Sequence, residues 1–339
     1  MTTLERRYRR VLRLLPASYR QTWEEDMVAT FLAGALPADP EDAEFMADYG
    51  RPDRSEVASV VRLAARLRLG GAGAPPRYAA WGEAVRRVAL AGLLVHAVDA
   101  LVGVGALLWL PQRFPELVAP DRMVTAWTLL GLGWVVAYLA LLDGHPRVAR
   151  LCAGLSLLPT VIAAAVDLVA TGGAYLASRF VWLVVAAVPV LALAAFHRDA
   201  EPVRPRPWLV ALPAGVVVVS LVLLLTQRPG PSPLVDWPGL ACVAVFAAAL
   251  VHQLGRIAGR GGMTATWPIA LVLLGVAALT LRVVTLLDHL QHTAPNPDQD
   301  TLLIAGLVEC GLVLIVVLPL AVRAARSLRS LSADFRTAA

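Results

Sequence analysis

Eight apolar runs dominate the sequence after residue 87, and each is long enough to cross a lipid bilayer as a helix. A transmembrane helix needs about 20 predominantly apolar residues, and we place the runs at 88–110, 123–142, 151–170, 179–196, 208–226, 237–254, 267–288 and 301–322. The chain is 16% charged, whereas soluble domains are about 25% charged. The sequence therefore predicts an all-α fold, a polytopic transmembrane helix bundle of about eight spans.

The first 70 residues are polar and carry apolar side chains at helical spacing, which predicts a small domain of four helices. Pro16 ends the first helix, the second covers about 17–36, and the third covers 41–49. Asp53 is expected to cap the fourth helix, with Glu56 completing a capping box. Arginines gather in the first helix and carboxylates in the next two. This segregation favours ion pairs between helices over the alternative, a basic face resting on anionic lipid.

The arginine distribution predicts which side of the membrane each loop occupies. One set of span flanks carries 13 arginines and the opposite set carries 4. The positive-inside rule then places both termini in the cytoplasm, which requires an even number of spans. We expect a cytoplasmic helical domain over 1–70, a linker and membrane approach over 71–87, the bundle over 88–322 and a cytoplasmic tail over 323–339. The absence of lysine suggests a GC-rich genome, and hence a bacterial inner membrane.

Charged residues inside the apolar runs form the candidate site. Arg282 in the seventh run and Glu309 in the eighth are expected at similar depth in the outer half of the bilayer, on faces of small residues. His96 and Asp99 are neighbours one turn apart on the first run. Together these four residues form a candidate intramembrane polar cluster. Two peripheral candidates, Asp167 and Arg179, flank an outer loop.

Two interpretations of this cluster stay open. A buried Arg282–Glu309 pair can fix helix packing, or a proton or substrate path can run through the cluster, since ionisable groups inside a membrane commonly serve transport. A weaker possibility is an outer-surface metal site at Asp288, His289 and His292, for which a solvated loop is the simpler explanation.

The composition excludes several classes of enzyme. All 30 basic residues are arginine, so the chain has no phosphate-loop lysine, no Schiff-base lysine and no kinase lysine. The three cysteines lack metal-ligand spacing. The net charge of +5 is assigned to basic loops and not to nucleic-acid binding. We expect no enzyme activity, no cofactor and no nucleic-acid partner.

The N-terminal segment carries a motif of moderate specificity. Residues 8–16 read YRRVLRLLP, followed by Tyr19-Arg20, Trp23-Glu-Glu-Asp-Met27 and Phe31. This arrangement resembles the permease-prefix domain and the similar helical segment of HAAS-type membrane proteins, which are often encoded beside PadR-type transcriptional regulators. The resemblance implies a cytoplasmic helical module attached to a membrane protein. Permease members carry a large extracytoplasmic domain, which the short outer loops here do not match, and no functional residue transfers.

These observations favour a non-enzymatic, regulatory or structural membrane protein. Its expected partners are the lipid bilayer and another membrane or cytoplasmic protein that contacts residues 1–70. The alternative is a transporter or permease subunit that uses a separate ATPase or an intramembrane proton or ion path.

Overall fold

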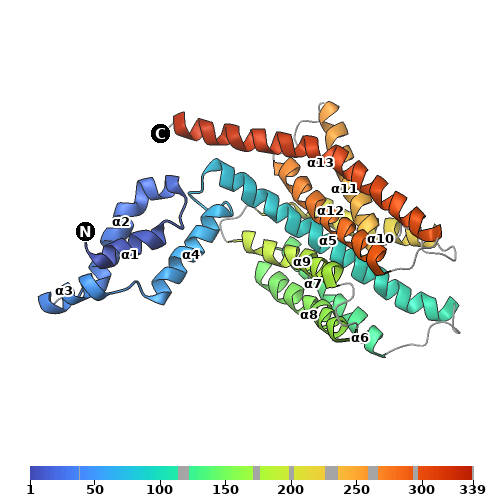
Figure 1. Cartoon of the computed structure of the whole chain (residues 1–339), viewed down its shortest axis with the longest axis horizontal. Coiled ribbons are helices and arrows are strands. Elements are labelled where there is room, and N and C mark those ends of the chain that lie inside the picture. The colour runs from blue at the N-terminus through green and yellow to red at the C-terminus, as the bar shows by residue number, and fades with distance from the viewer. Residues whose placement is uncertain are drawn as a thin grey trace. The chain divides into compact units, whose positions relative to one another are not determined.

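The computed structural model describes residues 1–37, 39–113, 122–170, 176–197, 202–225, 236–258, 266–292 and 297–337, and within these ranges it contains helices and no strand (Figure 1). Backbone contacts divide the chain into two compact units. One comprises Met1–Glu83, His197–Ala200 and Leu328–Ala339, and the other comprises Ala84–Phe196 and Glu201–Ser327. The all-α prediction is confirmed.

The N-terminal helical domain consists of α1 (Thr3–Leu12), α2 (Ala17–Ala35), α3 (Pro40–Tyr49) and α4 (Arg54–Arg68). Its core joins α1, α2 and α4 through Tyr8, Leu12, Leu15, Val28, Val60, Ala64 and Leu67. The Tyr8 ring stacks on Phe31 with 4.0 Å between the ring centroids. Most of the apolar positions that predicted these helices supply the buried face, but Trp23 and Val61 are exposed.

The expected capping box at α4 is only half formed. Asp53 is the N-cap and accepts a hydrogen bond from the Ser55 backbone N–H at 3.4 Å. The Glu56 carboxylate instead accepts a hydrogen bond from the Tyr8 hydroxyl at 2.8 Å. A tyrosine hydroxyl that becomes buried needs a polar partner, and Glu56 provides one, so the predicted role of Glu56 in a capping box is wrong.

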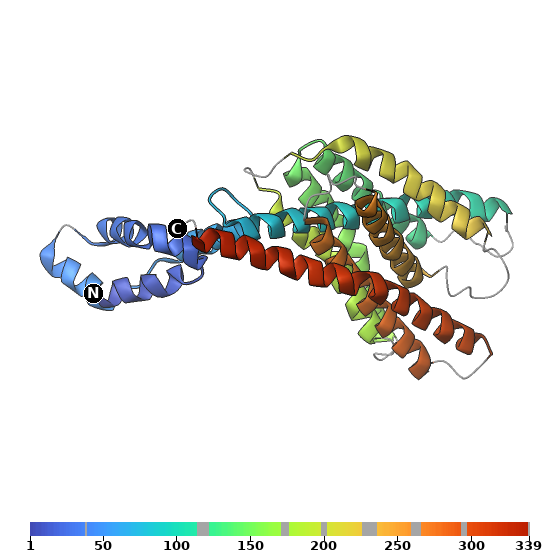
Figure 2. The same cartoon turned by 90° about the horizontal axis from the view of Figure 1, so that it is seen from above.

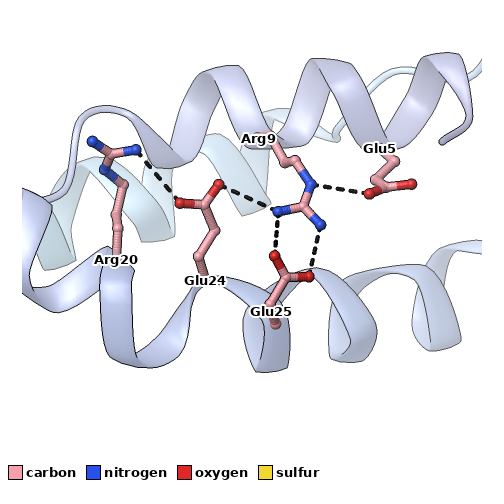
Figure 3. Close-up of polar contacts among 5 residues, drawn as sticks. All are labelled: Glu5, Arg9, Arg20, Glu24 and Glu25. Atoms are coloured by element: carbon pink, nitrogen blue, oxygen red, sulfur yellow. Dashed lines mark hydrogen bonds and ion pairs between the residues drawn. The ribbon is translucent and has the colours of Figure 1, made fainter.

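Ion pairs between α1 and α2 follow the segregation of charge in the sequence (Figure 3). Arg9 donates to Glu5 at 2.9 Å and makes two hydrogen bonds of 2.7 Å with Glu25. Glu24 bridges Arg9 at 3.5 Å and Arg20 at 3.4 Å. The prediction of pairing between the helices is confirmed for these residues.

The Arg9–Glu25 pair makes the stability of the domain depend on pH. The Arg9 guanidinium holds the pKa of Glu25 below its usual value. Because the folded-state pKa is depressed, the pair stabilises the domain above the ordinary glutamate pKa of about 4.3, and this contribution is lost as the pH falls through the folded-state pKa. We expect Glu25→Gln to remove part of the acid sensitivity of α1 and α2.

Hydrogen exchange of the full-length protein in detergent, corrected for intrinsic exchange rates and followed between pH 7 and about pH 3, measures this effect. Glu44→Gln is the matched control, because it removes an exposed carboxylate on α3. Equal pH profiles for the two variants would contradict the assignment.

The second unit holds the membrane bundle. Its helices are α5 (Pro76–Arg113, which begins in the first unit), α6 (Arg122–Gly131), α7 (Gly133–Leu142), α8 (Pro146–Ala170), α9 (Leu176–Ala192), α10 (Pro205–Leu225), α11 (Trp237–Ile257), α12 (Thr266–His292) and α13 (Pro297–Thr337). Eight helical segments in the described residues are long and apolar enough to cross a membrane, with α6 and α7 contributing to one of them. The chain is a multi-pass membrane protein, as predicted.

The ends of the bundle differ from the expected boundaries. Helix α5 begins at Pro76, inside the segment 71–87 that was expected to be a linker and membrane approach, because proline at a first helical turn has no N–H to leave unpaired. Helix α13 continues to Thr337, so residues 323–337 of the expected tail are helical (Figure 2). This helix contains Pro319. The second span breaks at Leu132, between α6 and α7.

Two hydrophobic clusters hold the bundle together. One joins α5, α7, α8 and α9, and the other joins α11, α12 and α13. Glycines allow close approach in both clusters. A Cβ on Gly92 would lie 2.7 Å from Pro189 of α9, and a Cβ on Gly275 would lie 2.5 Å from Val317 of α13. Small residues at helix crossings are typical of membrane bundles.

Substitution of Gly275 by alanine tests this packing. The added methyl group meets the Val317 side chain, and overpacking of this kind costs about 1–3 kcal/mol. Gly311 on α13 is the control, because a Cβ there meets nothing within 4 Å. Gly311→Ala should therefore be neutral or gain up to about 1 kcal/mol from helix propensity. Unfolding free energies in mixed detergent micelles measure both, and equal shifts would contradict the prediction.

Candidate functional site

Arg282 lies at the centre of the candidate site. It belongs to α12, is 1% exposed and is among the largest fully buried side chains described. Its Nε lies 2.7 Å from Oε2 of Glu309, which is on α13 and 3% exposed. Its Nη1 donates to Oδ2 of Asp236 at 2.5 Å. The guanidinium therefore joins two carboxylates from two other helices, and we call these three residues the Arg282 network.

Asp236 serves two structural purposes at once. As the N-cap of α11 it accepts a hydrogen bond from the Gly239 backbone N–H through Oδ1 at 2.9 Å, while Oδ2 accepts from Arg282. Asp236 is not among the candidate residues predicted from the sequence. The sequence does contain a signal for this ion pair. Asp236 begins a span on the same side of the membrane as Arg282, so the long Arg282 side chain can reach it.

The charges of the network do not balance. One guanidinium faces two carboxylates, so the formal charge of the ionised network is −1. Glu309 is buried, whereas the Asp236 side chain is 37% exposed. Removal of two charges from water costs several kcal/mol per ion, which only close pairing offsets. The geometry can lock helix packing, and its surplus carboxylate can hold a proton.

The structure places His96 in the other hydrophobic cluster. Its ring stacks on Trp134 of α7 with 4.3 Å between centroids, and it forms a hydrogen bond with the backbone of Ala186 on α9. Asp99, one turn further along α5, is exposed at the surface of the bundle. Arg282 and Glu309 are thus brought together, while the grouping of His96 and Asp99 with them stays a prediction.

The peripheral candidates have separate surroundings. Arg179 is exposed in the first turn of α9, and the Asp167 side chain lies outside the described residues, as does that of His292. Asp288 is buried and accepts a hydrogen bond from the Ser178 backbone N–H at 2.8 Å. A carboxylate at a helix N-terminus satisfies free N–H groups and the helix dipole. Asp288 therefore joins α12 to the start of α9, which accounts for its burial without a metal.

No family model matches this chain, and neither does any curated protein or solved structure with which it was compared.

The two carboxylates of the Arg282 network should differ in their contribution to stability. Glu309→Gln leaves a fully buried guanidinium with one anionic partner, and breaking a buried pair costs about 3–5 kcal/mol. Asp236→Asn should cost less, about 1 kcal/mol, because solvent screens the partly exposed Asp236 carboxylate and asparagine preserves the N-cap. Thermal and detergent unfolding of the purified variants measures the order, and an equal or reversed order would contradict it.

Proposed function

We propose that this multi-pass membrane protein is a non-enzymatic regulator whose helical domain binds a partner protein. The proposed location is a bacterial inner membrane with both termini in the cytoplasm, supported by the arginine asymmetry between the two sets of loops. The resemblance of the N-terminal segment to a cytoplasmic module of membrane proteins also supports this arrangement.

An exposed pair of aromatic rings on α3 carries the proposal. Phe45 is 62% exposed and Tyr49 is 71% exposed, and their rings stack with 5.1 Å between centroids. Large aromatic side chains are enriched in protein interfaces, where they supply contact area at low entropic cost. Two such rings side by side on one helix of a polar domain present an apolar surface that a partner can cover.

The end of α3 that carries these rings is anchored. Arg7 of α1 donates hydrogen bonds to the backbone oxygens of Tyr49 and Gly50, at the end of α3. Nearby, Glu24 and Glu25 of α2 are paired with Arg20 and Arg9. Stacked aromatic rings at an anchored helix end are suited to protein recognition, since each ring loses little side-chain freedom on binding.

The membrane bundle then acts as the anchor of the domain. The Arg282 network joins α11, α12 and α13 and favours one arrangement of these helices. A buried network of this kind needs no substrate to explain it, because ionic groups inside a membrane can specify packing.

Transport remains the second candidate, because of the surplus carboxylate in the Arg282 network. Among the described residues, Oε1 of Glu309 is buried without a hydrogen-bond partner. Such an oxygen can bind a proton or a cation that crosses the membrane. A transporter predicts that Glu309→Gln inserts and folds normally but loses a coupled flux across proteoliposomes, whereas the regulator predicts loss of stability alone.

A Phe45→Ala/Tyr49→Ala variant tests the regulatory function in the full-length protein. We expect this variant to lose a partner protein that the wild type retains after mild crosslinking in native membranes. The affinity for that partner should decrease at least about 10-fold, which corresponds to about 1.4 kcal/mol of binding free energy. Quantitative mass spectrometry of the co-purified proteins measures this loss. Val61→Ala is the control, because Val61 is an exposed apolar residue on α4.

The identity of the partner separates the two functions. A lost partner that is a transcription factor or a membrane protein supports regulation. An ATPase that co-purifies with the wild type favours transport. Identical protein sets for the wild type, the aromatic variant and the control would overturn the role of the aromatic pair.

A further inference from the structure

One end of the bundle gathers arginines around a buried histidine that the candidate site does not use. His252 on α11 is 2% exposed, and neither of its ring nitrogens has a hydrogen-bond partner among the described residues. The positive charges of Arg87, Arg256 and Arg323 all act on this ring. Buried polar groups are normally hydrogen-bonded, so a buried ring with three arginines in its vicinity points to an anionic ligand.

Three helices place these arginines at the same depth in the membrane, at the ends of their apolar runs. Arg87 directly precedes the apolar run of α5, Arg323 directly follows that of α13, and Arg256 lies in the last turn of α11. The Arg87 guanidinium lies over the Trp267 ring, 4.8 Å from its centroid, at the start of α12. Tryptophan favours the membrane–water interface. The arginines therefore lie at the depth of lipid headgroups.

The cluster is partly organised in advance. The Arg87 guanidinium is positioned by Trp267, and Arg323 donates a hydrogen bond to the side-chain oxygen of Gln253, the residue after His252. Arg256 and Arg323 are exposed, so an anion can reach them. The guanidinium fork matches the oxygens of a phosphate and binds it with charge-assisted hydrogen bonds.

Apolar residues beside the arginines indicate the rest of the ligand. Leu254 and Ile257 on α11 and Val322 on α13 are exposed next to the basic side chains. A free anion would make no use of this apolar surface, whereas acyl chains below a headgroup would contact it. Basic pockets between transmembrane helices are a recurrent form of lipid site.

We propose that Arg87, Arg256, Arg323 and His252 form a binding site for the phosphate of an anionic phospholipid. Arg256 and Arg323 contact the phosphate oxygens, the imidazole N–H of His252 donates to the same group, and Arg87 adds positive charge from α5. The lipid acyl chains lie along the exposed apolar residues of α11 and α13. This site does not depend on the proposed partner of the helical domain.

Lipid binding by the unaltered protein is the first test. Full-length protein is reconstituted in nanodiscs with phosphatidylglycerol and phosphatidylcholine at equal mole fractions, and native mass spectrometry counts the lipids retained after release. We expect preferential retention of phosphatidylglycerol that decreases at high salt, since charge contacts are screened. Equal retention of the two lipids would overturn the proposal without the need for any variant.

Variants then locate the site. Arg256→Gln/Arg323→Gln should weaken the apparent affinity for phosphatidylglycerol, measured from the stabilisation it gives, by about 25-fold. Each arginine near an anionic surface contributes about fivefold, so the loss of two contributes about 25-fold. Arg147→Gln is the control, an exposed arginine in the first turn of α8 outside the cluster. Thermal midpoints in pure phosphatidylcholine nanodiscs verify that each variant is folded. If the glutamine double variant does not fold, Arg256→Lys/Arg323→Lys is measured in its place. The lysine pair should lose part of the preference, because it keeps the charge without the fork.

Three outcomes would contradict the proposal. An equal loss with Arg147→Gln would mean diffuse surface charge, and an unchanged preference in both double variants would place lipid binding elsewhere. Stabilisation of wild type by millimolar inorganic phosphate, with no further effect of phosphatidylglycerol, would identify a site for free phosphate and not for a lipid.

Discussion

The packing of α11, α12 and α13 depends on one buried guanidinium. A charge in a hydrocarbon environment is tolerated only with close partners, and Arg282 has one carboxylate at the start of α11 and one on α13. Translation or rotation of any of these helices would lengthen at least one ion pair. Hydrophobic packing alone is weakly directional, because lipid tails are as apolar as leucine. The Arg282 network therefore supplies the directionality that the leucine and valine side chains of this cluster lack.

Much of the architecture could be predicted because it follows from periodicity and length. The eight spans, the four helices of the N-terminal domain and the meeting of Arg282 with Glu309 all follow from apolar spacing and helical rise. The role of Asp236 could not be predicted in this way, because its ion-pair partner Arg282 lies 46 positions away in the sequence. Glu56 was misassigned for a similar reason, because its partner Tyr8 lies 48 positions away in the sequence. Local rules assign residues to helices, whereas long-range contacts decide which of their polar atoms are used.

Electrostatics divides the protein into regions with different degrees of charge compensation. In the helical domain, Arg9 is surrounded by Glu5, Glu24 and Glu25, so its charge is more than balanced. In the Arg282 network the carboxylates also outnumber the guanidinium. Around His252, by contrast, three arginines act on one ring. The first two regions carry surplus negative charge, whereas the arginines near His252 favour an anion, which is why a membrane lipid is the ligand we propose there.

Helix α13 gives the chain a mechanical property. It carries Glu309 in the bundle and continues to Leu328, where it belongs to the same compact unit as the helical domain. At 1.5 Å per residue, about 28 Å of helix separates the two positions. An intact helix is stiff along its axis, so these two positions of α13 keep their separation along the helix unless it bends. Pro319 lies between them and lacks the N–H of a regular turn, so this residue is the point at which α13 bends most easily.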